Sequence, residues 1–307
     1  MTLAFITHPD CLLHNNGPQH PEHARRLEAV YSVLQVLGLY EYLTPLEAQQ
    51  ATKEDLALAH APLYIDDIFA KAPTDTGLVM LDPDTCMRPG TLAAALRAAG
   101  SGITAVDWVL QGSGYRAFCA IRPPGHHAES ASASGFCLFN NVAVAARHAL
   151  VRHGLSRVAI LDFDVHHGNG TEHIVAGDPR ILFCSSFQHP YYPFKGYPAS
   201  ANNCLNVPLE RGTSGDKWRA AVQAAWFGPL ERFAPELILL SAGFDAHYQD
   251  SLGGLLLDEE DYAWVTRCIV RLANQSAKGR IVSMLEGGYT PSILGNCVAT
   301  HLEALLS

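Results

Sequence analysis

The segment that says most about the architecture reads Val158-Ala159-Ile160-Leu161 and then Asp162-Phe163-Asp164-Val165-His166-His167-Gly168-Asn169-Gly170. The apolar run predicts a buried strand, and the glycines predict the loop that closes it. Because side chains alternate between the two faces of a strand, Asp162, Asp164 and His166 are expected to point to the same side. Ligands of α/β proteins bind at the carboxyl ends of strands, and carboxylates with an imidazole suit zinc, iron or manganese. The segment therefore predicts a metal site at a strand end, although a solvated strand end whose aspartate caps a helix gives the same pattern.

Apolar runs of strand length recur along the chain and alternate with amphipathic helical patterns. The expected strands are residues 3–7, 117–121, 158–161, 181–185, 237–241 and 281–285. The expected helices are residues 22–37, 91–111, 140–153, 214–233 and 259–276. This alternation predicts an α/β fold with a central, mostly parallel sheet and helices on both faces. No linker or repeat interrupts the pattern, so residues 1–307 are expected to form a single domain.

The composition is that of a soluble globular protein with a large core, since 48% of the 307 residues are hydrophobic and 17% are charged. The formal net charge of −9 argues against a nucleic-acid binder, which needs a basic face. The eight cysteines contain no C-x-x-C pair and fit a reducing cytoplasm better than a disulfide framework. The chain starts without a basic n-region, and no run of about 18 apolar residues occurs. We therefore expect a cytoplasmic protein without a signal peptide or membrane span. The sequence leaves open whether it forms a homo-oligomer.

Further polar residues lie on the loops that follow the expected strands. Arg122-Pro123-Pro124-Gly125-His126-His127 sets two imidazoles on a rigid loop, where a histidine pair binds metal or acts as general base and electrostatic partner. Any single histidine is by default a surface residue. Asp245 follows a strand and a tight glycine turn, either as a third acidic ligand or as an ordinary turn aspartate. Tyr289 follows two glycines that let the main chain approach a site, although a tyrosine packed in the core explains it equally well.

Aromatic residues lie on two of these long loops. Gly135-Phe136 belongs to the loop after residue 121, and Tyr191-Tyr192-Pro193 belongs to the loop after residue 185. Such rings either line a narrow apolar slot or fill the core.

Taken together, these segments resemble the zinc-dependent histone deacetylase family, in its bacterial and class II branch, which has the arginase–deacetylase fold. The matching segments occur in the family's order and span most of the chain: His20-Pro21-Glu22 with Arg26, Pro123-Pro124-Gly125-His126-His127, Gly135-Phe136-Cys137, Asp162 through Gly170, Ser241-Ala242-Gly243-Phe244-Asp245 and Glu286-Gly287-Gly288-Tyr289. As a set they are highly specific, although each alone is not. The resemblance implies an amidohydrolase that removes acetyl or other short acyl groups from N-ε-acyl-lysine in proteins or peptides.

The resemblance also implies the metal ligands. Asp164, His166 and Asp245 match the zinc ligands, which leaves positions open for water and a substrate carbonyl. Ferrous iron remains an alternative to zinc. Family members also hold a structural potassium ion through main-chain carbonyls at the positions of Asp162, Asp164 and His166, with a serine hydroxyl matching Ser185 and with Ser186 beside it.

Four further residues match the family's catalytic groups. His127 matches the general base that later returns its proton to the leaving amine, and His126 matches its electrostatic neighbour, paired with Asp162. Asn169 stands where some members have a second aspartate facing His127, and an amide cannot raise the basicity of His127 as a carboxylate does. Tyr289 matches the donor that stabilises the oxyanion together with zinc.

The remaining matches concern the substrate. Gly135, Phe136 and Tyr192 match the tunnel that encloses the acyl-lysine chain, where the family usually has phenylalanine at the second wall. Leu252 stands near its entrance, and Arg26 matches a structural or exit-channel residue behind the site.

Three other functions fit parts of the pattern. Arginase-like enzymes share the fold but need a carboxylate where this chain has Gly168, so their second manganese lacks a ligand. A non-catalytic reader of acyl-lysine is expected to lack the base, the tyrosine or the ligands, yet all are present. Acetylpolyamine amidohydrolases of the vertebrate kind carry a glutamate at the position of Leu252. The bacterial kind carry a long insertion where this chain has only Gly112-Ser113-Gly114-Tyr115. We therefore expect acyl-lysine as the substrate.

Overall fold

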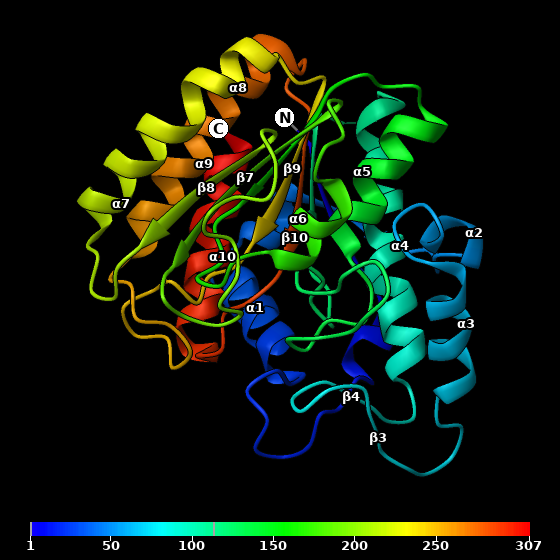
Figure 1. The fold of residues 1–307 in the computed structure, drawn as a ribbon. Coiled ribbons are helices and arrows are strands. Elements are labelled where there is room, and N and C mark those ends of the chain that lie inside the picture. Colours follow the sequence, from blue (N-terminus) through cyan, green and yellow to red (C-terminus); the bar gives the residue numbers. More distant parts are fainter. Residues whose placement is uncertain (1, 113) are drawn as a thin grey trace.

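The computed structural model describes residues 2–112 and 114–307, and its centre is an eight-stranded sheet (Figure 1). The strand order is β2-β1-β5-β10-β9-β6-β7-β8, and all neighbours in it are parallel. The strands are β1 Leu3–Thr7, β2 Leu43–Glu47, β5 Arg116–Cys119, β6 Val158–Asp162, β7 Ile181–Gln188, β8 Cys204–Leu209, β9 Leu237–Ala242 and β10 Ile281–Leu285. An antiparallel pair, β3 Val79–Met80 and β4 Cys86–Met87, lies outside this sheet. The predicted α/β fold with a mostly parallel sheet is confirmed.

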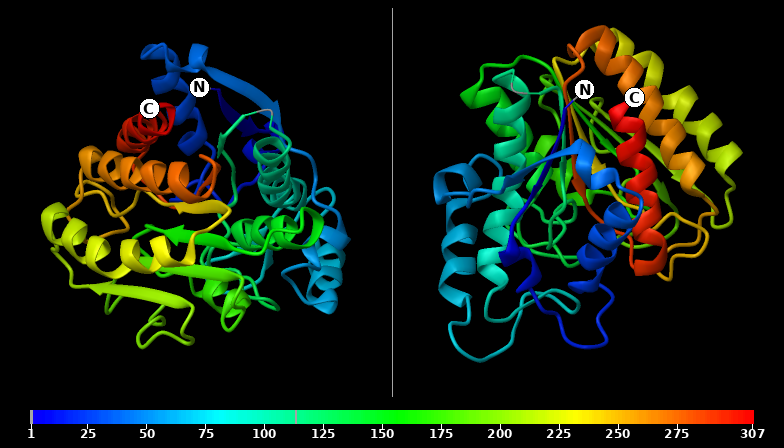
Figure 2. Two further views of the ribbon diagram at one scale, coloured as in Figure 1. Left: turned by 90° about the horizontal axis from the view of Figure 1, so that it is seen from above. Right: turned by 180° about the vertical axis from the view of Figure 1, so that it is seen from behind.

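Helices cover both faces of the sheet (Figures 1 and 2). One face carries α4 Thr91–Leu110 and α5 Asn141–Arg152, and the other carries α1 Arg25–Val36, α9 Glu259–Ser276 and α10 Pro291–Leu306. The shorter helices are α2 Lys53–Leu56, α3 Pro62–Lys71, α6 Asn169–Val175, α7 Gly215–Val222 and α8 Gly228–Phe233, with a π-helical turn at Gln223–Phe227 and 3-10 turns at Pro9–Leu12 and Leu39–Tyr42. Among the described residues, no helix combines the length and apolar character needed to cross a membrane.

The inner strands follow directly from their sequences. All residues of β6, β7, β9 and β10 are buried, as expected for parallel strands covered by helices on both faces. Helix starts are fixed by polar caps: the Asn140 side chain accepts a hydrogen bond from Ala143 N (3.0 Å) at the start of α5. Asp258 and Asp261 form a capping box at the start of α9. All eight cysteines are buried and free.

Several elements differ from the sequence prediction. The strands β2 and β8 are not predicted because each contains a proline, which a sheet accepts at its edges, and both lie at the edges. α2, α3 and the long α10 are also missed. α1 begins at Arg25, three residues later than predicted, because Glu22 is buried in an ion-pair cluster ahead of the helix. Of the short connection 112–115, residue 113 lies outside the described residues, but α4 ends at Leu110 and β5 begins at Arg116.

Candidate active site

The loops that carry the predicted metal ligands, both adjacent histidines and Tyr289 leave four adjacent strands at one edge of the sheet. β5, β10, β9 and β6 are neighbours in that order, and the loops begin where these strands end. Because the strands are parallel, their carboxyl ends meet and bring together side chains far apart in the chain.

Three of these side chains form a compact, buried group of metal-ligating type. Nδ1 of His166 lies 3.0 Å from Oδ1 of Asp164 and 3.1 Å from Oδ2 of Asp245. One ligand atom from each residue lies within 4.8 Å of the others. The residues predicted as metal ligands are therefore brought together.

Main-chain groups hold the outer oxygens of both carboxylates. Gly287 N donates to Oδ2 of Asp164 (2.8 Å), and Val165 N donates to Oδ1 of Asp245 (2.8 Å). A Cβ at Gly287 would lie 2.1 Å from Asp245 Oδ2, so this approach requires glycine. Oδ2 of Asp245 is buried and, among the described residues, has no hydrogen-bond partner of good geometry. An oxygen in that state is expected of a metal ligand.

The charges of the group also fit a cation. Burial and the Asp164 carboxylate raise the pKa of Asp245 to about 7. Two carboxylates held this close repel each other unless a positive charge lies between them. The donor set of two carboxylates and one imidazole fits zinc or ferrous iron.

The two adjacent histidines have different partners. Nδ1 of His126 lies 3.0 Å from Oδ2 of Asp162, and Nδ1 of His127 lies 2.8 Å from Oδ1 of Asn169. Although burial disfavours its charge, the carboxylates of Asp162 and Asp164 raise the pKa of His126 well above its usual value. Burial and the nearby imidazoles of His126 and His166 hold the pKa of His127 well below its usual value. His126 is therefore the charged ring of the pair, and His127 is the neutral ring.

Glu286 fixes the loop that carries these histidines, and the sequence gives no sign of this role. Its Oε2 accepts hydrogen bonds from Gly125 N (2.7 Å) and His126 N (3.2 Å), and Ser241 Oγ lies 3.1 Å from its Oε1. Burial raises the pKa of Glu286 to about 7. The strand-end glutamate thus ties β9, β10 and the histidine loop together.

The His20-Pro21-Glu22 segment supports the same loop from behind. Glu22 is fully buried and pairs with Arg122, whose Nη2 lies 2.8 Å from Oε2 of Glu22. Arg26 joins the pair (3.3 Å to Glu22 Oε1) and donates from Nε to the Gly288 carbonyl (2.6 Å). Arg26, expected as a structural or exit-channel residue, thus contacts the main chain one residue before Tyr289.

A pocket of about 190 Å³ reaches the candidate metal ligand His166 and contains all four predicted substrate residues. It is lined by Asp84, His127, Gly135, Phe136, His166, Tyr191, Tyr192, Leu252 and Tyr289. The ring of Tyr192 stands edge-on to His127 (5.0 Å between centres), and Phe136 stands edge-on to Tyr289 (5.8 Å). Tyr191 stacks on His166 (5.4 Å, 18°), so it belongs to the wall as well.

The sequence does not identify two further residues at this pocket. Asp84, from the β3–β4 region, belongs to no motif, yet it is among the residues that line the pocket, and burial beside Asp82 raises the pKa of its carboxyl to about 6. Asp250 accepts hydrogen bonds from Tyr289 N (2.6 Å) and Leu252 N (2.9 Å), which links the loops after β9 and β10.

The predicted potassium residues also lie together. Ser185 is the β7 partner of Asp162, and its hydroxyl lies 3.0 Å from His167 Nδ1. The Ser186 hydroxyl accepts from Trp218 Nε1 (3.0 Å). Among the described residues, the main-chain oxygens of Asp164 and His166 accept no hydrogen bond, so they are free to face a cation.

Gly168, the position where a second metal is expected to need a carboxylate, is tightly enclosed. A Cβ at Gly168 would lie 2.2 Å from Oδ2 of Asp162. A carboxylate side chain there requires Asp162 to move, which agrees with the sequence argument against a binuclear site.

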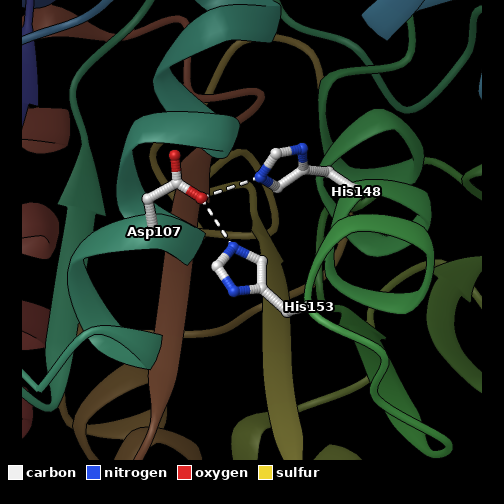
Figure 3. Close-up of side chains that lie close together, drawn as sticks. All are labelled: Asp107, His148 and His153. Atoms are coloured by element: carbon white, nitrogen blue, oxygen red, sulfur yellow. Dashed lines mark hydrogen bonds and ion pairs between the residues drawn. The ribbon is translucent and has the colours of Figure 1, made fainter.

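A second histidine–carboxylate cluster links α4 and α5 (Figure 3). Nε2 of His148 lies 2.8 Å, and Nε2 of His153 lies 2.7 Å, from the same oxygen of Asp107. Nδ1 of His148 is buried without a hydrogen-bond partner among the described residues. Because metal-binding histidines almost always donate from their second nitrogen, we interpret this cluster as a hydrogen-bonded tie between the helices.

Comparison with known proteins agrees with this geometry. The family model described as the histone deacetylase domain matches residues 20–305. The histone deacetylase-like amidohydrolase of Pseudomonas aeruginosa is 38% identical over 295 residues, which covers 94% of this chain and 76% of that protein. The human protein named polyamine deacetylase HDAC10 is 33% identical over 327 residues, and the chain spans 48% of its length.

Two more comparisons concern a longer relative and a solved structure. The type-2 histone deacetylase 2 of Dictyostelium discoideum is 43% identical over 245 residues, 73% of this chain but 14% of that protein. The crystal structure of the HDA15 HD domain has a TM-score of 0.93 and 30% identity, over 99% of this chain and 88% of that one. The chain therefore belongs to the histone deacetylase family and is a hydrolase of the deacetylase type.

Proposed function

We propose that this enzyme hydrolyses the amide bond of N-ε-acyl-lysine in proteins or peptides, with acetyl or another short acyl group, and that it depends on zinc. The observation that carries the proposal is that one pocket is lined by His127, Tyr289 and His166, and that His166 belongs to the buried Asp164–His166–Asp245 group.

Asp164, His166 and Asp245 are the proposed zinc ligands. The buried Oδ2 of Asp245, which has no hydrogen-bond partner of good geometry among the described residues, supports this assignment. Zinc held by three protein ligands supplies Lewis acidity, which makes water a stronger nucleophile near neutral pH. Ferrous iron has the same preference for these donors and is the alternative metal.

His127 is the proposed general base and later acid. Because its Nδ1 faces the amide oxygen of Asn169 (2.8 Å), Nδ1 carries the proton and Nε2 carries the lone pair. The lowered pKa of His127 keeps the ring neutral before it accepts a proton from water. His126, charged and paired with Asp162, adds positive charge beside the reacting carbonyl.

Tyr289 is the proposed donor to the oxyanion. Burial raises the pKa of its phenol well above the usual value, so the hydroxyl keeps its proton. A preorganised donor of this kind is typically worth about 3 to 4 kcal/mol.

The pocket walls support a linear aliphatic substrate. Phe136, Tyr191 and Tyr192 enclose the apolar stem of an acyl-lysine, while Leu252 offers no charge to a distal ammonium. Acetylpolyamine hydrolysis is the second candidate, because a relative carries that name and because Asp84 offers a carboxylate at the same pocket. The missing glutamate at residue 252 leads us to prefer acyl-lysine.

Further properties are part of the same proposal. We assign residues 1–307 to one catalytic domain, supported by the family match from 20 to 305. A structural potassium ion is proposed at the main-chain oxygens of Asp162, Asp164 and His166 with Ser185 and Ser186. The buried, unpaired cysteines support a cytoplasmic location.

Turnover of matched substrates tests the proposal. The purified enzyme is assayed with acetyl-, propionyl- and butyryl-lysine peptides and with N-acetylputrescine, alongside its zinc content. We expect bound zinc and a higher kcat/KM for one of the peptides. A higher kcat/KM for N-acetylputrescine contradicts the substrate assignment, and absence of both zinc and turnover supports a non-catalytic binding module.

A further inference from the structure

The tautomer of His127 depends on which end of the Asn169 amide faces it. The oxygen end accepts from Nδ1–H and leaves a lone pair on Nε2, whereas the NH2 end would donate to Nδ1 and move the proton to Nε2. In the structure the oxygen faces His127 at 2.8 Å. An amide by itself allows either orientation, so something else must select this one.

Glu129 makes that selection. Nδ2 of Asn169 donates to Oε1 of Glu129 at 2.9 Å. A carboxylate only accepts hydrogen bonds, so a flipped amide would set its oxygen against the Glu129 oxygen at this distance and lose the hydrogen bond to Glu129.

Glu129 is itself held in place and charged. Lys195, from the loop between β7 and β8, donates to the same Oε1 at 2.6 Å. The Glu129 main chain is bound on both sides, by Ser132 O (3.0 Å) and by His60 Nδ1 (3.0 Å). Although partial burial opposes it, the hydrogen bonds from Lys195 and Asn169 lower the pKa of Glu129.

Glu129 does not line the substrate pocket. It lies in a separate pocket of about 200 Å³, together with Asn169, His173 and Lys195, and the two pockets share no lining residue. Its effect on the reaction therefore passes through Asn169.

We propose that Glu129, anchored by Lys195, is a positioning residue that fixes the Asn169 amide and thereby keeps the lone pair of His127 on Nε2. This inference rests on the proposed role of His127 as general base. The Asn169–Glu129 pair then keeps the proton of His127 on Nδ1. An aspartate at the position of Asn169 would do the same but would add a charge beside His127.

An exchange of the two side chains tests the proposal. In Glu129→Gln the partner amide fits either orientation of Asn169, so kcat is expected to fall roughly tenfold with little change in KM. In Asn169→Asp two carboxylates oppose each other, and kcat is expected to fall as well. In Glu129→Gln/Asn169→Asp the amide introduced at residue 129 donates to the carboxylate introduced at residue 169, so kcat is expected to rise above both single variants. If the fold-loss of kcat in the double variant equals the product of the fold-losses in the two single variants, the two residues act independently and the proposal is overturned.

The ring nitrogens of His127 give a readout independent of turnover. The ¹⁵N shifts of the zinc-loaded enzyme should show Nδ1–H in the wild type and a mixture of tautomers in Glu129→Gln. An unchanged tautomer in Glu129→Gln overturns the positioning role even if the wild type is an active deacylase. A wild type without turnover but with the expected tautomer shift overturns the proposed function and leaves the positioning intact.

A variant in the same pocket serves as the matched control. Nδ1 of His173 lies 3.8 Å from Oε2 of Glu129, beyond hydrogen-bond distance, and its Nε2 lies 2.9 Å from the Ser130 hydroxyl, so its ring is not a partner of the Asn169 amide among the described residues. His173→Ala is expected to keep the wild-type kcat and tautomer. A loss in His173→Ala equal to that in Glu129→Gln would show a general effect of the pocket and contradict the specific role of Glu129.

Discussion

The guanidinium of Arg26 lies over the ring of Tyr289, 4.9 Å from its centre. The same arginine donates to the carbonyl of Gly288, one residue before the tyrosine. The phenol is thus held from its face and through its main chain. A donor fixed in this way loses little entropy when charge develops on the substrate oxygen.

Tyr289→Phe removes only the hydroxyl. We expect an unchanged Tm and metal content with kcat lowered about 100- to 1,000-fold, because the donor acts mainly on the transition state. Steady-state kinetics and metal analysis measure this. Tyr248→Phe, at an exposed tyrosine, is the control and should behave as wild type. A wild-type kcat in Tyr289→Phe contradicts the oxyanion role.

Arg26→Lys tests the support behind the tyrosine. A lysine cannot contact the carbonyls of Glu286 and Gly288 and the Glu22 carboxylate at once, so we expect stability to fall by about 1 to 3 kcal/mol. kcat should also fall while zinc content stays the same, since the ligands are not touched. Chemical denaturation and kinetics give both values. Lower stability with an unaltered kcat would limit Arg26 to a role in folding.

Alanine substitutions separate the two adjacent histidines. His127→Ala removes the proposed base, and His126→Ala removes a charged neighbour, so the former should lose more kcat, about 100-fold or beyond. The comparison uses kcat at saturating substrate, with bound zinc measured in each variant. The reverse order would assign the base to His126.

His60 predicts a pH dependence of stability outside the metal site. Burial lowers its pKa to about 4, and its Nε2 accepts from Asn140 N (2.8 Å), which a protonated ring cannot do. The unfolded chain therefore binds this proton more readily than the folded protein below about pH 6.5. The contribution of His60 to the free energy of unfolding is therefore fully present above about pH 6.5. It decreases as the pH drops toward 4, by about 2 kcal/mol at pH 5.

His60→Gln provides the comparison. The variant is less stable at pH 7.5, but the difference from wild type should narrow toward pH 5, because glutamine does not titrate. Urea denaturation at both pH values measures it, with equal metal loading. A stability difference that stays constant with pH contradicts the assignment to His60.

The sequence predicts much of the site because its chemistry needs particular residue types at strand ends. Asp164, His166 and Asp245 meet as expected, as do His126 with Asp162 and His127 with Asn169. Parallel strands carry their loops to one edge, which brings these motifs together, whereas the pairing of each histidine with its partner was implied by the family resemblance.

The supporting residues could not be predicted. Glu286, Asp250 and Glu129 act through main-chain groups or through another side chain, and their partners lie far away in the chain. A single acidic residue in a loop has no periodicity or spacing that identifies its partner. The edge strands β2 and β8 were missed for a related reason, since their prolines hide the strand pattern.

Amide hydrolysis by this enzyme is proposed to need a zinc ion held by Asp164, His166 and Asp245. Metal content and acetyl-lysine peptide turnover, measured before and after chelation and zinc readdition, test this for the wild type and for Asp245→Ala. We predict one zinc per chain, activity that disappears with chelation and returns with zinc, and neither metal nor activity in the variant. Full turnover by metal-free wild-type enzyme would contradict the zinc dependence.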